Sequence, residues 1–231
     1  MYKQFHGEYL GGSLVNWYPG QSWLKWAYRR VDGKYVDEVL RDYFPDYECK
    51  GVFFDIGAFE PITISNSHHF HMNGWDVYSF EANTELIPLL KQYRQNVFNY
   101  AICDEDKDEI EFNVVSNGSW TAGFSAIEIS EDYKRIFPGG IETITKIKVP
   151  QRTLNTIINN EISYLDHIDI ISIDIEGGEL KCLYGIDLNK YNPQVILIEN
   201  VTNDQKITNY LLNFGYKLDK QISYNQYYIK I

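Results

Sequence analysis

The sequence predicts an α/β protein with an open, mostly parallel β-sheet, helices on both faces and an antiparallel hairpin at the C-terminal end. Three observations support this prediction. Short apolar runs such as 51–56 and 168–174 are typical of parallel strands that are buried on both faces. Segments with helical periodicity alternate with these runs, as expected of a parallel sheet covered by helices. The last two strand-like segments have no helix between them, so one of them must run antiparallel.

The first 48 residues differ from the rest because they are rich in Tyr, Trp and Gly. Their apolar spacing predicts helices over 21–30 and 34–44. We therefore expect a helical N-terminal cap over residues 1–48 and a main domain over residues 49–231. The tryptophans of the cap are expected to pack it onto the sheet rather than to stack on a sugar. These residues are Trp17, Trp23 and Trp26.

In the main domain, strand and helix patterns follow one another from residue 51 onward. The predicted strands are 51–56, 76–81, 99–103, 109–115, 168–174 and 194–199, followed by the hairpin strands 216–222 and 226–231. The predicted helices are 63–73, 86–97 with Pro88 in its first turn, 153–158, 179–183 and 204–214. Residues 116–145 contain four glycines, and a loop of this length is usually functional. We interpret its part 116–125, around Trp120, as a substrate lid.

Length and charge exclude several classes of protein. The chain has 231 residues, which is enough for one large domain. Its charge of 21 − 32 = −11 repels phosphate backbones and anionic lipids, so we expect no nucleic-acid partner and no membrane-surface binding. Three scattered cysteines are too few for a disulfide framework or a cysteine-based zinc site. There is no apolar leader segment and no run of about 18 apolar residues, so the expectation is a cytoplasmic protein.

Acidic residues follow most of the predicted strands. The carboxyl ends of parallel strands lie at one edge of a sheet, and ligands bind at that edge. Acids also stabilise helix N-termini, but that effect accounts for only one or two of these positions. The segments at the strand ends are Asp55–Ala58, Glu81–Asn83, Cys103–Asp104, Asp174–Gly177 and Glu199–Asn200.

Gly57 and Glu81 indicate the class of ligand. A glycine turn after the first strand lets a ligand approach the backbone, and an acid after the second strand can accept hydrogen bonds from a ribose diol. The turn lacks the G-x-G-x-x-G pattern of dinucleotide sites, and Glu60 would repel a pyrophosphate. The site therefore suits a nucleoside with a positive charge, a description that S-adenosylmethionine meets.

Several motifs together resemble the FkbM family of methyltransferases. They are FFDIGA at 53–58, YSFEAN at 78–83, VPQRTLN at 149–155, IDIEGGEL at 173–180 and VILIE at 195–199. The resemblance implies the Rossmann-like class I methyltransferase fold with a seven-stranded sheet and S-adenosylmethionine as cofactor. It also implies O-methylation of a sugar hydroxyl, in a nucleotide-activated sugar or a surface polysaccharide. Where many members continue A-N-x-G, this chain has Ala58-Phe59-Glu60-Pro61.

The resemblance implies roles for individual residues. Cofactor-binding residues are expected in three segments: Asp55, Gly57 and Ala58 on the methionine side, Glu81, Ala82 and Asn83 at the ribose, and Cys103 and Asp104 at the adenine edge. Asp174 and Glu176 match the acids beside the transferred methyl group. A sugar hydroxyl is a poor nucleophile, so a carboxylate base is expected. Either Asp174 or Glu176 can be that base.

Other interpretations stay open. Asp174, Glu176 and Glu199 could hold a divalent cation through oxygen atoms, but carboxylates alone are a weak metal signal, and no metal ligand is assigned. His68 and His71 could share a helix face, where one of them could contact substrate or act as base. The alternative functions are a nicotinamide-dependent oxidoreductase and a non-catalytic nucleoside-binding module. The missing glycines argue against the first, and the acid pair argues against the second.

Overall fold

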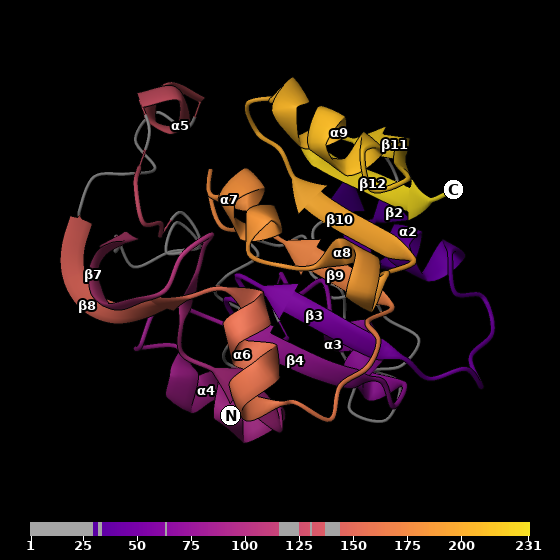
Figure 1. The fold of residues 1–231 in the computed structure, drawn as a ribbon, viewed down its shortest axis with the longest axis horizontal. Coiled ribbons are helices and arrows are strands. Elements are labelled where there is room, and N and C mark those ends of the chain that lie inside the picture. Colours follow the sequence, from indigo (N-terminus) through magenta and orange to yellow (C-terminus); the bar gives the residue numbers. More distant parts are fainter. Residues whose placement is uncertain (1–29, 32–33, 63, 116–124, 130, 137–143) are drawn as a thin grey trace.

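The computed structural model describes residues 30–31, 34–62, 64–115, 125–129, 131–136 and 144–231. Their main sheet has seven strands in the order β11-β12-β10-β9-β3-β4-β5 (Figure 1). The strands are β3 Val52–Ile56, β4 Asp76–Phe80, β5 Asn96–Phe98, β9 Ile170–Ile173, β10 Val195–Glu199, β11 Tyr216–Ile222 and β12 Asn225–Lys230. Five of them run parallel, and β12 is antiparallel to both β10 and β11. The predicted mostly parallel sheet with its antiparallel C-terminal hairpin is confirmed.

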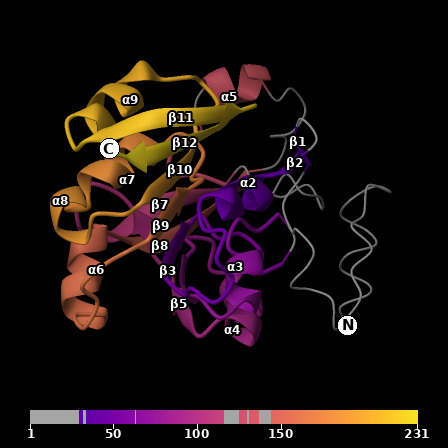
Figure 2. The same cartoon turned by 90° about the vertical axis from the view of Figure 1, so that its right-hand side faces the viewer.

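Helices cover both faces of this sheet (Figure 2). α2 (Val36–Asp42) and α3 (His68–Met72) pack on one face, around Phe53, Val77 and Leu197. The opposite face carries α6 (Leu154–Glu161), α7 (Glu179–Tyr184), α8 (Leu188–Tyr191) and α9 (Gln205–Leu212). α4 (Ile87–Tyr93) packs beside Val97 of the edge strand β5. Because neighbouring residues of a strand point to opposite faces, the fully buried strand β3 feeds both cores.

Side chains and proline set several helix starts. The Thr153 hydroxyl accepts a hydrogen bond from the Thr156 N–H at 3.0 Å and caps α6. Carboxylates cap α8 and α9 in the same way, from Asp187 and Asp204. Pro88 lies in the first turn of α4, as predicted, where its missing N–H has no intrahelical partner to lose.

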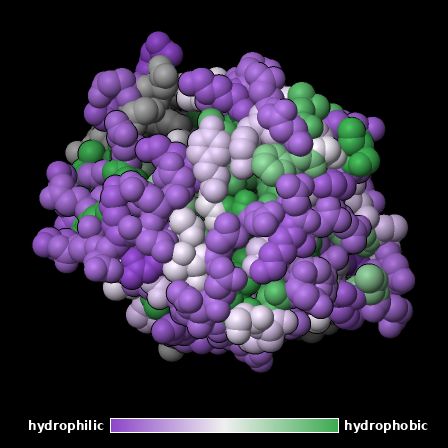
Figure 3. All heavy atoms as spheres, in the orientation of Figure 1, coloured by the Kyte–Doolittle hydropathy of each residue, from purple (hydrophilic) through white to green (hydrophobic). Residues whose placement is uncertain are grey.

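A second sheet stands beside the main one and was not predicted in full. It contains β6 (Ala101–Ile102), β8 (Ile144–Arg152) and β7 (Lys107–Val115), in that order. β8 is missing from the predicted elements, although Ile147 and Val149 alternate with lysines as in a half-buried strand. The lysines form ion pairs with β7, Lys146 with Glu111 and Lys148 with Glu109. Hydrophilic side chains cover this side of the molecule (Figure 3).

Several predicted elements have different bounds in the structure. The predicted helix 63–73 is the shorter helix α3, which begins at His68. The predicted helix 86–97 ends as α4 at Tyr93, because Arg94 has an extended backbone with φ −126° and ψ 142°. Val97, assigned to that helix by its spacing, lies instead in β5. The predicted strand 99–103 is wrong in extent, since only Ala101–Ile102 form a strand there and it belongs to the second sheet. Between the two, Asn99 donates side-chain hydrogen bonds to the carbonyl oxygens of Glu81 and Ala82, which draws the chain away from β5.

Some predictions fall on residues 1–29 and 116–124, outside the described part of the chain. These are the cap tryptophans, most of the helix 21–30, whose last residue Arg30 belongs to a short hairpin, and most of the substrate lid. That hairpin pairs β1 (Arg30–Val31) with β2 (Lys34–Tyr35). Within 125–145, α5 spans Glu131–Ile136. The division at residue 48 stays a prediction. No helix among the described residues has the length and apolarity needed to span a bilayer.

The turn after β3 passes very close to the end of β9. Gly57 has φ +80°, and its N–H donates to the Phe80 carbonyl at 2.9 Å. A Cβ atom at this position would lie 1.8 Å from the Asp174 carbonyl oxygen. Only glycine fits here, because both the backbone conformation and the available space exclude a side chain.

We predict that Gly57→Ala destabilises the protein on the order of 3–5 kcal/mol, since the added methyl group must displace backbone. Gly74→Ala is the matched control. Gly74 has φ +82°, but the nearest atom to an added Cβ is 3.6 Å away, so only the left-handed strain of about 1–2 kcal/mol applies. Urea unfolding of both variants measures the difference. Equal losses of unfolding free energy would contradict the close approach of Gly57 to Asp174.

Candidate functional site

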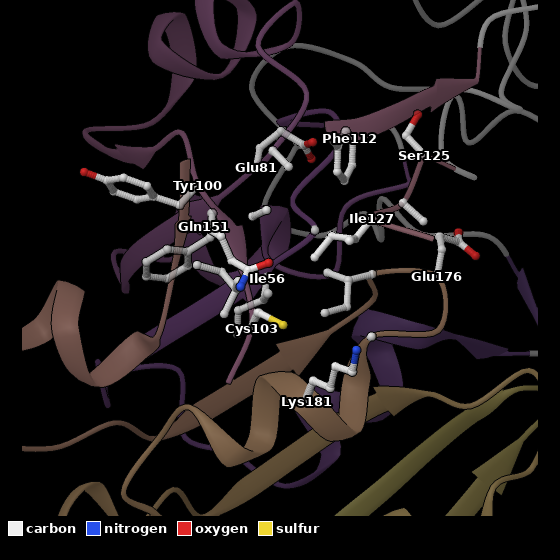
Figure 4. A pocket seen from close by; sticks show the side chains of 18 of the residues that line it. Ile56, Glu81, Tyr100, Cys103, Phe112, Ser125, Ile127, Gln151, Glu176 and Lys181 are labelled. Carbon is white, nitrogen blue, oxygen red and sulfur yellow. The ribbon is translucent and has the colours of Figure 1, made fainter. Parts of the chain in front are cut away.

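A cavity of about 240 Å³ lies at the carboxyl ends of the parallel strands. The turns after β3, β4 and β9 form one side, and the second sheet forms another. Figure 4 shows Glu81, Cys103, Gln151, Phe112 and Glu176 around this space. The location follows from the topology, because the carboxyl ends of parallel strands open onto a common edge.

The cavity brings together seven of the ten residues expected to bind cofactor or act in catalysis. The seven are Gly57, Glu81, Ala82, Cys103, Asp104, Asp174 and Glu176. Asp55, Ala58 and Asn83 do not line it. All three are buried directly behind the lining loops, with exposed fractions of 3% each. Their contacts therefore stabilise the loops that line the cavity and do not form the lining itself.

Glu81 anchors the loop after β3 to the end of β4. Its Oε2 accepts a hydrogen bond from the Phe59 N–H at 2.9 Å, and its Oε1 accepts one from the Asn83 N–H at 2.7 Å. A carboxylate has about four acceptor positions, so the backbone donors do not use all of them. Burial raises the pKa of Glu81 to about 7, although backbone hydrogen bonds from Asn83, Phe59 and Ala82 lower it.

Asp55 lies under this loop and faces away from the cavity. Its Oδ2 accepts a hydrogen bond from the Ser67 hydroxyl at the start of α3. Burial raises the pKa of Asp55 to about 6, while Ser67 and the positive charge of Arg94 lower it. Asp55 thus joins β3 to α3 behind the candidate site.

Ala58 and Asn83 also support the loops from behind. Ala58 packs with Ile87 and Leu90 of α4. The Asn83 side-chain oxygen accepts a hydrogen bond from the Glu85 N–H at 3.1 Å, which fixes the turn that leads into α4.

Three carboxylates meet at the ends of β9 and β10. Oxygen atoms of Asp174, Glu176 and Glu199 lie within 4.8 Å of one another. Glu176 has φ +60° and Gly177 has φ +107°, so the chain turns sharply after Asp174 and brings Glu176 back over the strand end. Burial and the negative charges of Asp174 and Glu176 raise the pKa of Glu199 well above its ordinary value.

The second sheet supplies lining residues that sequence reasoning missed. Ile110 and Phe112 of β7, Gln151 of β8 and Ile127 border the cavity, as does Lys181 of α7. Phe112 and Val149 pack together on the inner face of this sheet. The period-two alternation of β7 and β8 was the available signal, but alternation alone does not reveal which other element the apolar face meets.

The lining is strongly acidic. It contains six carboxylates and two ammonium groups, which are Glu81, Asp104, Glu105, Glu128, Asp174 and Glu176 against Lys107 and Lys181. Such a surface attracts a cation and repels a pyrophosphate.

The histidine cluster lies outside the cavity. His68 and His69 are buried in α3, with exposed fractions of 2% and 0%, and neither lines the cavity. Burial lowers the pKa of His69 to about 3 and that of His71 to about 4. His69 and His71 are therefore neutral at physiological pH.

Comparison with known proteins identifies one family. The model of the methyltransferase FkbM domain matches residues 55–218. A search of curated proteins returns no match. A crystal structure of methyltransferase FkbM from Methylobacillus flagellatus is 15% identical with a TM-score of 0.49, over 78% of this chain and 43% of that chain, so this chain spans less than half of its length. A precorrin-6y C5,15-methyltransferase from Geobacter metallireducens is 15% identical with a TM-score of 0.37, over 83% of this chain and 86% of that one.

We predict that Asp55→Asn stabilises the protein at pH 8 but not at pH 4. Burial raises the folded pKa of Asp55 from 3.8 to about 6, so its contribution to stability is full below pH 3.8 and is lost as the pH rises through 6. Removing the charge recovers at most roughly 3 kcal/mol at pH 8. Urea unfolding at the two pH values measures the effect. Asp108→Asn, at a fully exposed side chain, is the control. An equal effect of Asp55→Asn at both pH values would contradict the prediction.

Proposed function

The chain belongs to the FkbM methyltransferase family, and from that premise we propose that it is an S-adenosylmethionine-dependent O-methyltransferase acting on a sugar hydroxyl. The acceptor we propose is a nucleotide-activated sugar or a surface polysaccharide. The observation that carries the proposal is the presence of the Gly57 turn, Glu81 and the pair Asp174 and Glu176 in one cavity. A nucleoside-binding half and a carboxylate base are thereby next to each other.

The residues present fit the cofactor. S-adenosylmethionine supplies a methyl group that is already activated on a positively charged sulfur. The Glu81 carboxylate keeps acceptor capacity for a ribose hydroxyl, and Gly57 leaves its backbone open to close approach. Cys103 and Asp104, at the end of β6, would border the adenine. The six carboxylates of the lining favour the sulfonium charge.

The residues outside the lining receive a supporting role in this proposal. Asp55 and Ala58 hold the loop after β3 through Ser67 and α4, and the Asn83 N–H orients the Glu81 carboxylate. They are positioning residues for the cofactor-binding loops.

The carboxylates at the end of β9 are suited to base catalysis. One of Asp174 and Glu176 would accept the proton of the acceptor hydroxyl, which would make the hydroxyl oxygen nucleophilic enough to take the methyl group that the cofactor supplies. Their oxygen atoms lie within 4.8 Å of those of Glu199, so the end of β9 and β10 concentrates proton-accepting groups. Glu105, Glu128 and Gln151 add acceptors for the other hydroxyls of a sugar.

The acidic lining and the family match both argue against a nicotinamide-dependent oxidoreductase, since a dinucleotide carries a pyrophosphate. A non-catalytic nucleoside-binding module needs no carboxylate pair at the end of β9. The two acids in the same cavity as Glu81 therefore favour an enzyme.

We predict that S-adenosylmethionine binds about tenfold more tightly at pH 8 than at pH 6, because the ribose hydroxyls donate to ionised Glu81, whose pKa is about 7. Glu81→Gln should weaken binding and remove the pH dependence. Isothermal titration calorimetry at both pH values tests this. A wild-type affinity that is the same at both pH values would argue against ribose binding by Glu81.

We further predict that labelled methyl groups from S-adenosylmethionine appear as O-methyl ethers on a sugar acceptor. Asp174→Asn and Glu176→Gln should each be compared with the wild type. The variant that lacks the base should have a kcat lower by a factor of about 10²–10⁴. Cofactor affinity should change less than threefold in both. Mass spectrometry of products from nucleotide sugars and oligosaccharides provides the measurement. Transfer to a non-sugar acceptor alone would overturn the acceptor class, and cofactor binding with no transfer to any acceptor would favour the binding module.

A further inference from the structure

The three carboxylates of Asp174, Glu176 and Glu199 have an amide side chain near them, that of Asn225. Asn225, the first residue of β12, pairs with Glu199 of β10 in the antiparallel register. Directly opposite residues in such a pair place their side chains on the same face, about 4.5–5.5 Å apart at Cβ. The alternation along β12 agrees, because Tyr227 packs with Leu197 on that face. The Asn225 and Glu199 side chains therefore leave the sheet next to each other on the same face.

Asn225 is buried and its amide oxygen lacks a partner. Its exposed fraction is 4%, and its Oδ1 makes no hydrogen bond with any described residue. A buried acceptor without a donor costs about 1–3 kcal/mol, so native structures usually satisfy it. Glu199 satisfies it only in its protonated form, because an ionised carboxylate is itself only an acceptor. A cation between the two groups satisfies both.

The atoms of these four side chains that can bind a metal ion are all oxygens. Carboxylate and amide oxygens are the ligands of hard divalent cations, whereas zinc and copper sites draw on imidazole or thiolate. Opposite ligands of such a cation lie about 4.2 Å apart for Mg²⁺ and about 4.6–5.2 Å apart for Ca²⁺, twice the usual metal–oxygen distance. The carboxylate oxygens of the trio already lie within 4.8 Å of one another. The cluster is thus compact enough to hold one ion.

We propose that Asp174, Glu176, Glu199 and Asn225 form a binding site for one hard divalent cation, of the class of Mg²⁺, Mn²⁺ and Ca²⁺. Its binding does not depend on the proposed function, but its role does. Two of its ligands, Asp174 and Glu176, line the cavity, so the ion would contact the acceptor hydroxyl and lower that hydroxyl's pKa. The remaining carboxylate oxygens would stay available as base.

The test is a titration of the full chain with Mn²⁺ at pH 8, after dialysis against a chelator and in the absence of cofactor and acceptor. Electron paramagnetic resonance measures the bound Mn²⁺. We expect one site with a Kd below about 1 mM. Glu199→Gln should weaken binding at least about tenfold. Asn225→Leu should do the same without a change in net charge, which separates a ligand from a general effect of negative potential.

Two further variants keep the test decisive. Asn225→Asp adds a carboxylate at the same place and should strengthen binding at least about threefold, even if Asn225→Leu folds poorly. Glu111→Gln removes a charge from the exposed pair with Lys146 and should leave the Kd unchanged. The site is refuted by a wild type that binds no Mn²⁺ at millimolar concentration, by Asn225 variants that both bind like wild type, or by equal weakening in Glu111→Gln. Failure to bind S-adenosylmethionine would refute the proposed function while leaving this result intact.

Discussion

The candidate site depends on the close approach of the β3 turn to the end of β9. Gly57 passes so near the Asp174 carbonyl oxygen that no side chain fits between them. This approach lets one short turn border both the Glu81 side and the carboxylate side of the cavity. A larger residue would separate the two sides, and Glu81 would no longer share a cavity with Asp174 and Glu176. Steric exclusion at a single residue therefore connects the two halves of the site.

The second constraint is electrostatic. The fold buries Asp55, Glu81, Glu179 and Glu199 near one sheet edge, and burial is the largest cause of the raised pKa of each. Such groups lower the free energy of unfolding when they ionise, so the charge state that attracts a cationic ligand is also the one in which the protein is less stable. Backbone N–H groups offset part of this cost, as at Glu81 and at Glu179, whose Oε1 accepts from the Gly177 N–H at 2.8 Å. A sulfonium or a divalent cation would offset more of it.

The second sheet turns an open sheet edge into a cavity. β7 and β8 place ion pairs on their outer face and Phe112 and Val149 on their inner face. The inner face packs with Ala82, which follows β4, and with Ala101 of β6, so the lining is apolar opposite the carboxylates. Apolar surroundings strengthen the interactions of charged groups, because they exclude the water that would screen them. The fold thus places carboxylates at the edge of the main sheet and apolar side chains of the second sheet opposite them.

The main sheet except β5, the antiparallel hairpin and the edge at which the acids gather could all be predicted from the sequence. Buried parallel strands are continuous apolar runs, and runs such as 51–56 and 168–174 have few other interpretations. The edge strand β5 was not predicted, because three residues are too few to show a periodicity. β8 was not predicted either, and the alternation of its residues does not indicate which element its apolar face contacts. Only the tertiary structure separated Gly57 and Glu81, which line the cavity, from Asp55, Ala58 and Asn83, which support it from behind. It also brought Asn225 beside Glu199, since register between strands far apart in the chain is set by packing and not by local sequence.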